Sequence, residues 1–196
     1  MRHPDPGDPG TGPGPVQRLD DLAELPETPL LENSCLILEP LRVAHAEVMV
    51  GLLSDPELYK YTGGSPPTEE QLRSQYERQV RGRSPRGDER WFNWVARENC
   101  SGEVVGYVQA TVHQAREGLV AEVAWVIGAP YQGRGLAKSA AKMMKQWLCR
   151  EGVHGFTAHV HLEHLASAAV ATHLGLSPNG LLEGGEAVWT GTRKVP

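Results

Sequence analysis

The sequence has few cysteines, few aromatic side chains, no long apolar run and no surplus of basic charge. Its three cysteines, Cys35, Cys100 and Cys149, are scattered and form no CxxC pair, so neither a disulfide framework nor a cysteine zinc site is expected. The net charge of −5 is opposite to that of most nucleic-acid-binding proteins. No apolar run reaches the length of a membrane span, and the first residues lack a signal-peptide pattern. We therefore expect a cytoplasmic protein with no nucleic-acid partner and no membrane partner.

The length and composition indicate one folded domain with an N-terminal extension. A chain of 196 residues with 40% hydrophobic content can bury one sizeable core. Residues 1–17 are mostly Pro, Gly and Asp, which predicts a disordered tail. Residues 18–33 contain Pro26 and Pro29 and read as an extended lead-in that packs on the domain surface. The single domain is then expected over residues 34–196.

Hydrophobic periodicity and turn residues predict about seven strands and about four helices, an α+β protein. Thr68 followed by Gln71 is a capping-box signal for the start of one helix. The expected strands are residues 35–39, 91–97, 104–112, 119–127, 155–161, 181–183 and 187–193, and the expected helices are residues 43–53, 69–82, 135–150 and 165–174. The order is therefore strand, two helices, three strands, helix, strand, helix and two strands.

The most informative stretch is residues 131–138, which follows an apolar strand and opens a long amphipathic helix. Gly133 and Gly135 allow the backbone to approach a ligand closely, and the helix presents free N–H groups and a positive dipole end. This combination favours an anion such as phosphate. The stretch fits neither the P-loop pattern nor the three-glycine dinucleotide pattern. A plain glycine-rich turn before a helix is the alternative interpretation.

Gln132, Gly135 and Ala137 form a Gln-x-x-Gly-x-Ala pattern that resembles the pyrophosphate-binding motif of the GNAT superfamily of N-acetyltransferases. The order of elements from about residue 30 to residue 194 is also similar to that superfamily. Residues 36–42 and 53–57 resemble the branch that includes ribosomal-protein alanine N-acetyltransferases. The resemblance implies a three-layer α/β fold around a mixed sheet, with acetyl-CoA as co-substrate.

By the same resemblance, the co-substrate is held by two adjacent segments. The backbone of Val126, Ile127 and Gly128 would pair with the pantetheine arm and donate an N–H to the thioester oxygen. The pyrophosphate would lie on the residues that follow, namely Gln132, Gly133, Arg134, Gly135, Leu136, Ala137 and Lys138.

The sequence departs from the family pattern in the helix expected at residues 165–174. The branch usually begins this helix with an Asn followed three positions later by a Ser; here His164 replaces the Asn and Ser167 is retained. Many other members carry a Tyr that acts as a general acid, and Ala171 stands at that position. Ser167 is left as the candidate to protonate the departing thiolate, and His164 as a candidate contact to the co-substrate.

Glu122 is the candidate general base, because it interrupts an otherwise apolar strand and many superfamily members use a Glu on this strand. Burial in such a run would raise the pKa of its carboxyl group. The alternative is a structural carboxylate paired with a surface Arg. His159, His161 and His164 invite a metal interpretation, but no His-Glu-x-x-His helix accompanies them, so we expect no metal.

The sequence thus predicts transfer of an acetyl group from acetyl-CoA to a primary amine, either a protein N-terminus or a small molecule, by direct attack in a ternary complex. Its first rival is a non-catalytic acyl-CoA-binding or sensor module on the same fold, favoured by the missing Tyr and the substituted Asn. A nucleotide-binding protein is a second rival. The sequence leaves open which amine is the acceptor and whether the protein forms a homodimer.

Overall fold

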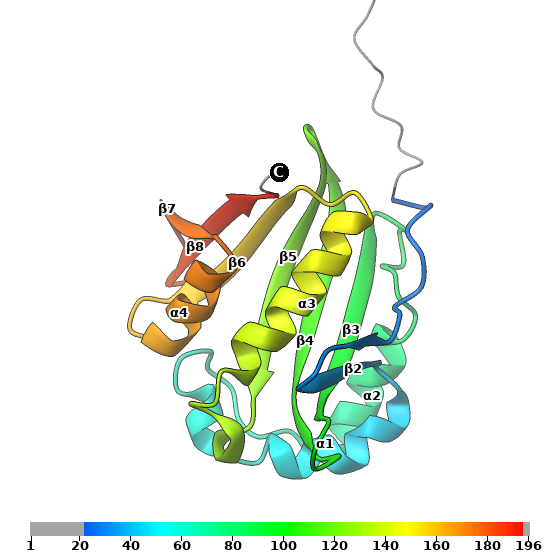
Figure 1. Ribbon diagram of the computed structural model, residues 1–196, viewed down its shortest axis with the longest axis vertical. Helices are drawn as coiled ribbons and strands as arrows, with labels where there is room; N and C mark the ends of the chain where they lie inside the picture. Colours follow the sequence, from blue (N-terminus) through cyan, green and yellow to red (C-terminus); the bar gives the residue numbers. More distant parts are fainter. Residues whose placement is uncertain (1–21, 194–196) are drawn as a thin grey trace, which may run out of the picture.

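The computed structural model describes residues 22–193, and within them eight strands form one sheet in the order β1-β2-β3-β4-β5-β6-β8-β7 (Figure 1). The strands are β1 (Leu31–Glu32), β2 (Leu36–Pro40), β3 (Glu89–Glu98), β4 (Val104–Ala115), β5 (Gly118–Ile127), β6 (Gly155–His161), β7 (Ser177–Glu183) and β8 (Glu186–Thr192). The prediction of about seven strands was one short, because β1 comprises only two residues and lies in the lead-in. The tail expected at residues 1–17 lies outside the described residues.

Four α-helices occur in the described chain, in the order that the sequence predicts. They are α1 (Ala46–Leu52), α2 (Glu69–Gln79), α3 (Leu136–Arg150) and α4 (Leu165–His173), with 3-10 turns η1 (Val43–His45), η2 (Pro56–Tyr59) and η3 (Ala129–Tyr131). The predicted capping box at α2 is confirmed: Thr68 Oγ1 accepts the Gln71 N–H at 3.2 Å, and Gln71 Oε1 accepts the Thr68 N–H at 2.8 Å.

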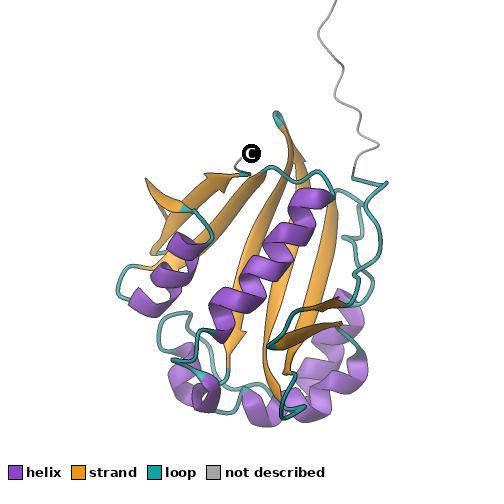
Figure 2. Cartoon of the chain, viewed as in Figure 1, coloured by secondary structure: helices purple, strands orange, loops and turns teal. Residues whose placement is uncertain are grey.

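The helices cover the two faces of the sheet in separate pairs (Figures 1 and 2). Helices α3 and α4 pack on one face, where Trp147 meets the rings of Phe92 and Trp94 edge-on at 5.0 and 5.5 Å between centroids. Helices α1 and α2 pack on the other face, where Met49 and Leu72 are buried with residues of β3 and β4. The result is the predicted three-layer arrangement.

The sheet is interrupted between β5 and β6, its only parallel neighbours in the described chain. These two strands are paired only where residues 120–122 face residues 155–157. Beyond Glu122 they diverge, so the backbone groups of residues 123–127 that point toward β6 have no strand partner within the described residues. Both strands therefore present free edges to the space between them.

The lead-in packs into the core rather than lying over it. Leu22 and Leu25 are each 6% exposed and belong to the cluster that α3 and β3 build. Trp94 Nε1 donates to the Pro29 carbonyl at 2.7 Å, and Arg90 donates to the Leu25 and Pro26 carbonyls at 2.6 and 2.9 Å. The segment therefore covers the part of β3 that β2 leaves unpaired.

Candidate acetyl-CoA site

A sharp backbone turn joins β5 to α3 through η3. Gly133 and Gly135 adopt φ angles of 75° and 77°, in the left-handed region where other residues are strained, and α3 begins immediately afterwards. Gln132 holds the turn against the strand, because its Nε2 donates to the Ile127 carbonyl at 2.9 Å. The Gln and the two glycines singled out in the sequence thus have separate structural roles in one loop.

The turn is an open cradle of N–H donors. Among the described residues, the backbone N–H groups of residues 133–137 have no acceptor within hydrogen-bond distance. A Cβ atom added at Gly133 or Gly135 would meet no atom within 4 Å, so the space in front of these donors is free. Because α3 adds the positive end of its dipole, the cradle is suited to an anionic group.

The two basic residues of the cradle differ in their surroundings. Arg134 forms an ion pair with Glu98 at the end of β3, whereas Lys138 is exposed on the first turn of α3. The Ser101 hydroxyl, and after it the charge of Arg134, hold the pKa of the Glu98 carboxyl below its ordinary value. Arg134 is therefore anchored beside the cradle, and Lys138 is an exposed cation at its rim.

The end of β5 lies next to the cradle and fits closely against its neighbours. A Cβ at Gly106 would lie 2.1 Å from the Val126 carbonyl oxygen, and a Cβ at Gly128 would lie 2.2 Å from Leu52 Cδ1. Only glycine fits at these two positions without movement of the backbone or of Leu52. The Val126 side chain faces the α1–α2 side of the sheet, while Ile127 is buried under α3. The close packing thus fixes the backbone of residues 126–128 at the end of β5, where β5 and β6 are no longer paired.

Trp125 bridges that gap to α4. Its Nε1 donates to Ser167 Oγ at 3.1 Å, which leaves the Ser167 hydroxyl proton available for another acceptor. His164 precedes α4 and stacks on Tyr61, with 4.4 Å between ring centroids. Burial, and after it the charge of His161, lowers the pKa of His164. Ser167 therefore faces the gap, while the His164 ring is engaged by the segment that precedes α2.

Glu122 is not buried, contrary to the expectation from its apolar neighbours. It projects from the middle of β5 on the α1–α2 side of the sheet, between Thr111 and Thr157 on the adjacent strands, and is exposed. Strand alternation explains the error: Ala121 and Val123 face the core, whereas Glu122 points to the opposite face of the sheet, where its side chain is exposed. Within the described residues no Arg or Lys lies at ion-pair distance from it, so the alternative of a surface pair is not met either.

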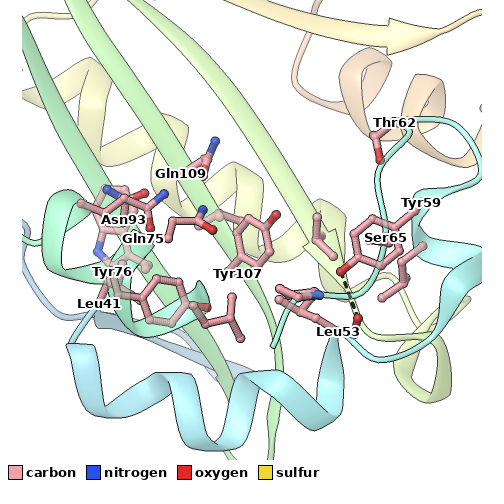
Figure 3. A pocket seen from close by; sticks show the side chains of 17 residues that line it. Leu41, Leu53, Tyr59, Thr62, Ser65, Gln75, Tyr76, Asn93, Tyr107 and Gln109 are labelled. Carbon is pink, nitrogen blue, oxygen red and sulfur yellow. Dashed lines mark hydrogen bonds between the residues drawn. The ribbon is translucent and has the colours of Figure 1, made fainter. Parts of the chain in front are cut away.

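A pocket of about 340 Å³ opens beside Val126, between the sheet and helices α1 and α2 (Figure 3). We call it the sheet pocket; its polar lining consists of Tyr59, Thr62, Ser65, Gln75, Tyr76, Gln79, Asn93, Tyr107 and Gln109. Burial raises the pKa of Tyr107 to about 12. Tyr59 Oη donates to the Leu53 carbonyl at 2.9 Å and closes one side.

Sequence reasoning missed this lining. The available signal was the pair of amide residues Asn93 and Gln109, which interrupt otherwise buried strands and could have indicated a polar pocket. The remaining members come from segments up to 85 positions apart, from residue 41 to residue 126, and only the fold brings them together.

The three histidines considered for metal binding do not converge. His159 Nε2 lies 3.9 Å from Glu183 Oε2, whereas the rings of His161 and His164 lie against the ring of Tyr61. No cluster of three or more His, Cys, Asp or Glu residues suited to a metal ion occurs in residues 22–193. None of the helices in the same residues is long and apolar enough to cross a membrane.

Comparison with known proteins identifies the architecture. The family model described as Acetyltransferase (GNAT) domain matches residues 36–177, which is more than half of the chain. No curated protein sequence matches significantly.

Three solved structures are informative. One is RimL, a ribosomal L7/L12 α-N-protein acetyltransferase in complex with coenzyme A. It is 15% identical, the match covers 84% of this chain and 97% of RimL, and the TM-score is 0.68. The ribosomal-protein-S5-alanine acetyltransferase from Vibrio fischeri gives 15% identity, coverage of 84% and 97%, and a TM-score of 0.66. The microcin C7 self-immunity acetyltransferase MccE, in complex with acetyl-CoA and AMP, gives 15% identity, coverage of 82% and 94%, and a TM-score of 0.67.

These likenesses confirm the predicted fold and its mixed sheet, in which the structure shows β5 and β6 to be the parallel pair. The family match covers β2 through the start of β7 and so includes the cradle, the gap and the sheet pocket. This chain therefore belongs to the GNAT acetyltransferase family.

Proposed function

We propose that this protein transfers the acetyl group of acetyl-CoA to a primary amine by direct attack in a ternary complex. The observation that carries the proposal is the meeting of three features at Val126: the donor cradle, the gap between β5 and β6, and the sheet pocket. The amine nitrogen would attack the thioester carbonyl carbon, the carbon–sulfur bond would break, and the thiolate would take up a proton while the nitrogen loses one.

The backbone would supply most of the binding. The N–H groups of residues 133–137 would bind the two phosphates, with Lys138 adding charge at the rim. The free edge of β5 would pair with the amide groups of the pantetheine arm, and an N–H from residues 126–128 would polarise the thioester carbonyl. MccE, whose solved complex contains acetyl-CoA, and RimL, solved with coenzyme A, share this fold and support the assignment.

Two side chains would move the protons. Ser167 accepts a hydrogen bond from Trp125, so its own hydroxyl proton can be donated to the departing sulfur. Glu122 lies on the same side of β5 as Val126 but four residues away, about 13 Å by strand geometry. Glu122 would therefore remove the amine proton through intervening water rather than directly.

The decisive experiment is to measure N-acetylated product by mass spectrometry with acetyl-CoA and a panel of amines that includes peptides with free N-termini. Product formation from any of them supports transferase activity. Binding of acetyl-CoA without product from every amine tested would instead favour the acyl-CoA-binding module, to which the buried Ala171 at the usual tyrosine position also points.

Glu122→Gln tests the proposed base. Gln is nearly isosteric and the cradle lies on another segment, so acetyl-CoA affinity should be unchanged while kcat falls by about a hundredfold. The pH profile of kcat should also change in shape, because a base that takes part in proton removal contributes to that profile. Glu117→Gln, an exposed carboxylate in the turn before β5, is the matched control and should leave kcat unchanged. An unaltered kcat and pH profile in Glu122→Gln would show that Glu122 plays no part in proton removal.

A further inference from the structure

A second hollow, of about 500 Å³, opens at the edge of β3 between the lead-in and the loop from α2 to β3. Three arginines line it, Arg81, Arg83 and Arg90, and we call it the arginine hollow. Glu27 is the only carboxylate among its described lining residues. The positive charge of this wall is therefore only partly neutralised by the protein.

The arginines of the hollow are held together despite their mutual repulsion. Arg83 pairs with Arg90 as a backbone bridge, and burial together with the charge of Arg83 lowers the pKa of Arg90. Arg90 is fixed by neutral carbonyl groups of the lead-in and of Gly82.

Arg81 and Arg83 are exposed, and no carboxylate of the described residues lies within ion-pair distance of either one. By contrast, Arg86 of the same loop is paired with Asp88 at 3.0 Å. The wall thus offers two guanidinium groups whose bidentate donors are available for carboxylates.

The arginine hollow continues from the sheet pocket. Leu41, Gln79 and Asn93 line both, so the two spaces share one wall. On β3, the residue in register with Val126 is Val95, two strand spacings or about 10 Å away. Arg90 lies five residues further along β3, about 17 Å. The backbone of Arg90 is therefore roughly 20 Å from the place where the amine would react, and Arg83 is bridged to Arg90 one strand spacing away.

We propose that the acceptor is the N-terminus of an extended peptide that carries acidic side chains at about its fourth to sixth residues. The amine enters the sheet pocket, and the carboxylates bind Arg81 and Arg83 in the hollow. An extended chain rises about 3.3 Å per residue, so roughly six residues cover the distance, and the long arginine side chains shorten it. A small amine bearing one carboxylate cannot place its nitrogen in the sheet pocket and its carboxylate on Arg81 or Arg83 at the same time. The inference rests on the proposed function and names its substrate class.

The test uses three seven-residue peptides with free N-termini, in the presence of acetyl-CoA. One has glutamates at its fourth, fifth and sixth positions, one has glutamines there, and one has glutamates at its second and third positions. The first should have a kcat/KM about tenfold above the second and third, a preference that weakens at high salt. The double variant Arg81→Gln/Arg83→Gln should abolish the preference, while Arg86→Gln, from the same loop, should keep it.

The outcome for the glutamine peptide separates this inference from the proposed function, because its acetylation requires the transferase chemistry but not the arginines. Binding provides a readout without turnover: the N-acetylated forms of the first two peptides are compared by fluorescence anisotropy. Equal affinity of these two forms, or an acidic preference that persists in the double variant, would overturn the inference even if every peptide is acetylated.

Discussion

Replacing Leu25 with alanine should lower the free energy of unfolding by about 2–4 kcal/mol, although the residue lies in a proline-rich lead-in outside the regular elements. Leu25 is 6% exposed and packs in the main core cluster, so truncation leaves a cavity that this segment cannot easily close. The adjoining carbonyls are fixed by Arg90, which limits relaxation. For a domain of this size, about 3 kcal/mol corresponds to a drop in Tm of roughly 6–12 °C.

Thermal unfolding followed by circular dichroism, with urea titrations for the free energy, would measure this change. Leu30→Ala is the matched control, since Leu30 belongs to the same segment but is 58% exposed and should change stability by less than about 0.5 kcal/mol. Deletion of residues 1–17 should have no effect on Tm. Equal small effects of the two alanine substitutions would refute the conclusion that the lead-in is part of the core.

Two further predictions concern the cradle and the first strands. Gly135→Ala places a side chain at a φ of 77° in open space, so it should cost about 1 kcal/mol of stability without a clash, and Gly135→Glu should in addition abolish the rise in Tm that acetyl-CoA produces. The hydrogen bond from Arg97 is the main cause that holds the pKa of Glu39 below its ordinary value. Between about pH 5 and pH 3 the folded state then binds fewer protons at Glu39 than the unfolded state, so stability falls as the pH falls. Urea titrations at both ends of this range should show that Glu39→Gln loses about 0.5–1 kcal/mol less unfolding free energy than the parent protein. An equal loss in the two proteins would show that the pair with Arg97 contributes nothing.

The sequence was sufficient for the order of elements and for the cradle, because these depend on local signals. Thr68 and Gln71 cap a helix through contacts three residues apart, and the cradle glycines adopt the left-handed conformation that their residue type favours. The two-residue strand β1 is too short for any periodicity to reveal it. The family resemblance supplied the rest of the topology.

The errors and omissions concern the surroundings of residues. Whether Glu122 is buried depends on what the tertiary structure packs against that face of β5, which no local pattern encodes. The sheet pocket and the arginine hollow combine segments that are distant in the sequence, and the burial of Leu25 depends on partners in β3 about 65 positions away. Such long-range arrangements follow from the tertiary structure and not from composition or spacing.

The divergence of β5 and β6 also has a mechanical consequence. The ladder between them has only three rungs, so the part of the molecule that contains β6, β7, β8 and α4 is held to the rest mainly by side chains in the shared core and by hydrogen bonds such as those from Trp125 to Ser167 and from Lys145 to the Leu174 carbonyl. Along most of this seam the sheet therefore lacks the backbone hydrogen bonds that stiffen it elsewhere. A ligand arm that pairs with the free edge of β5 would replace the missing rungs, so the stiffness of the whole sheet would become a property of the complex and not of the chain alone.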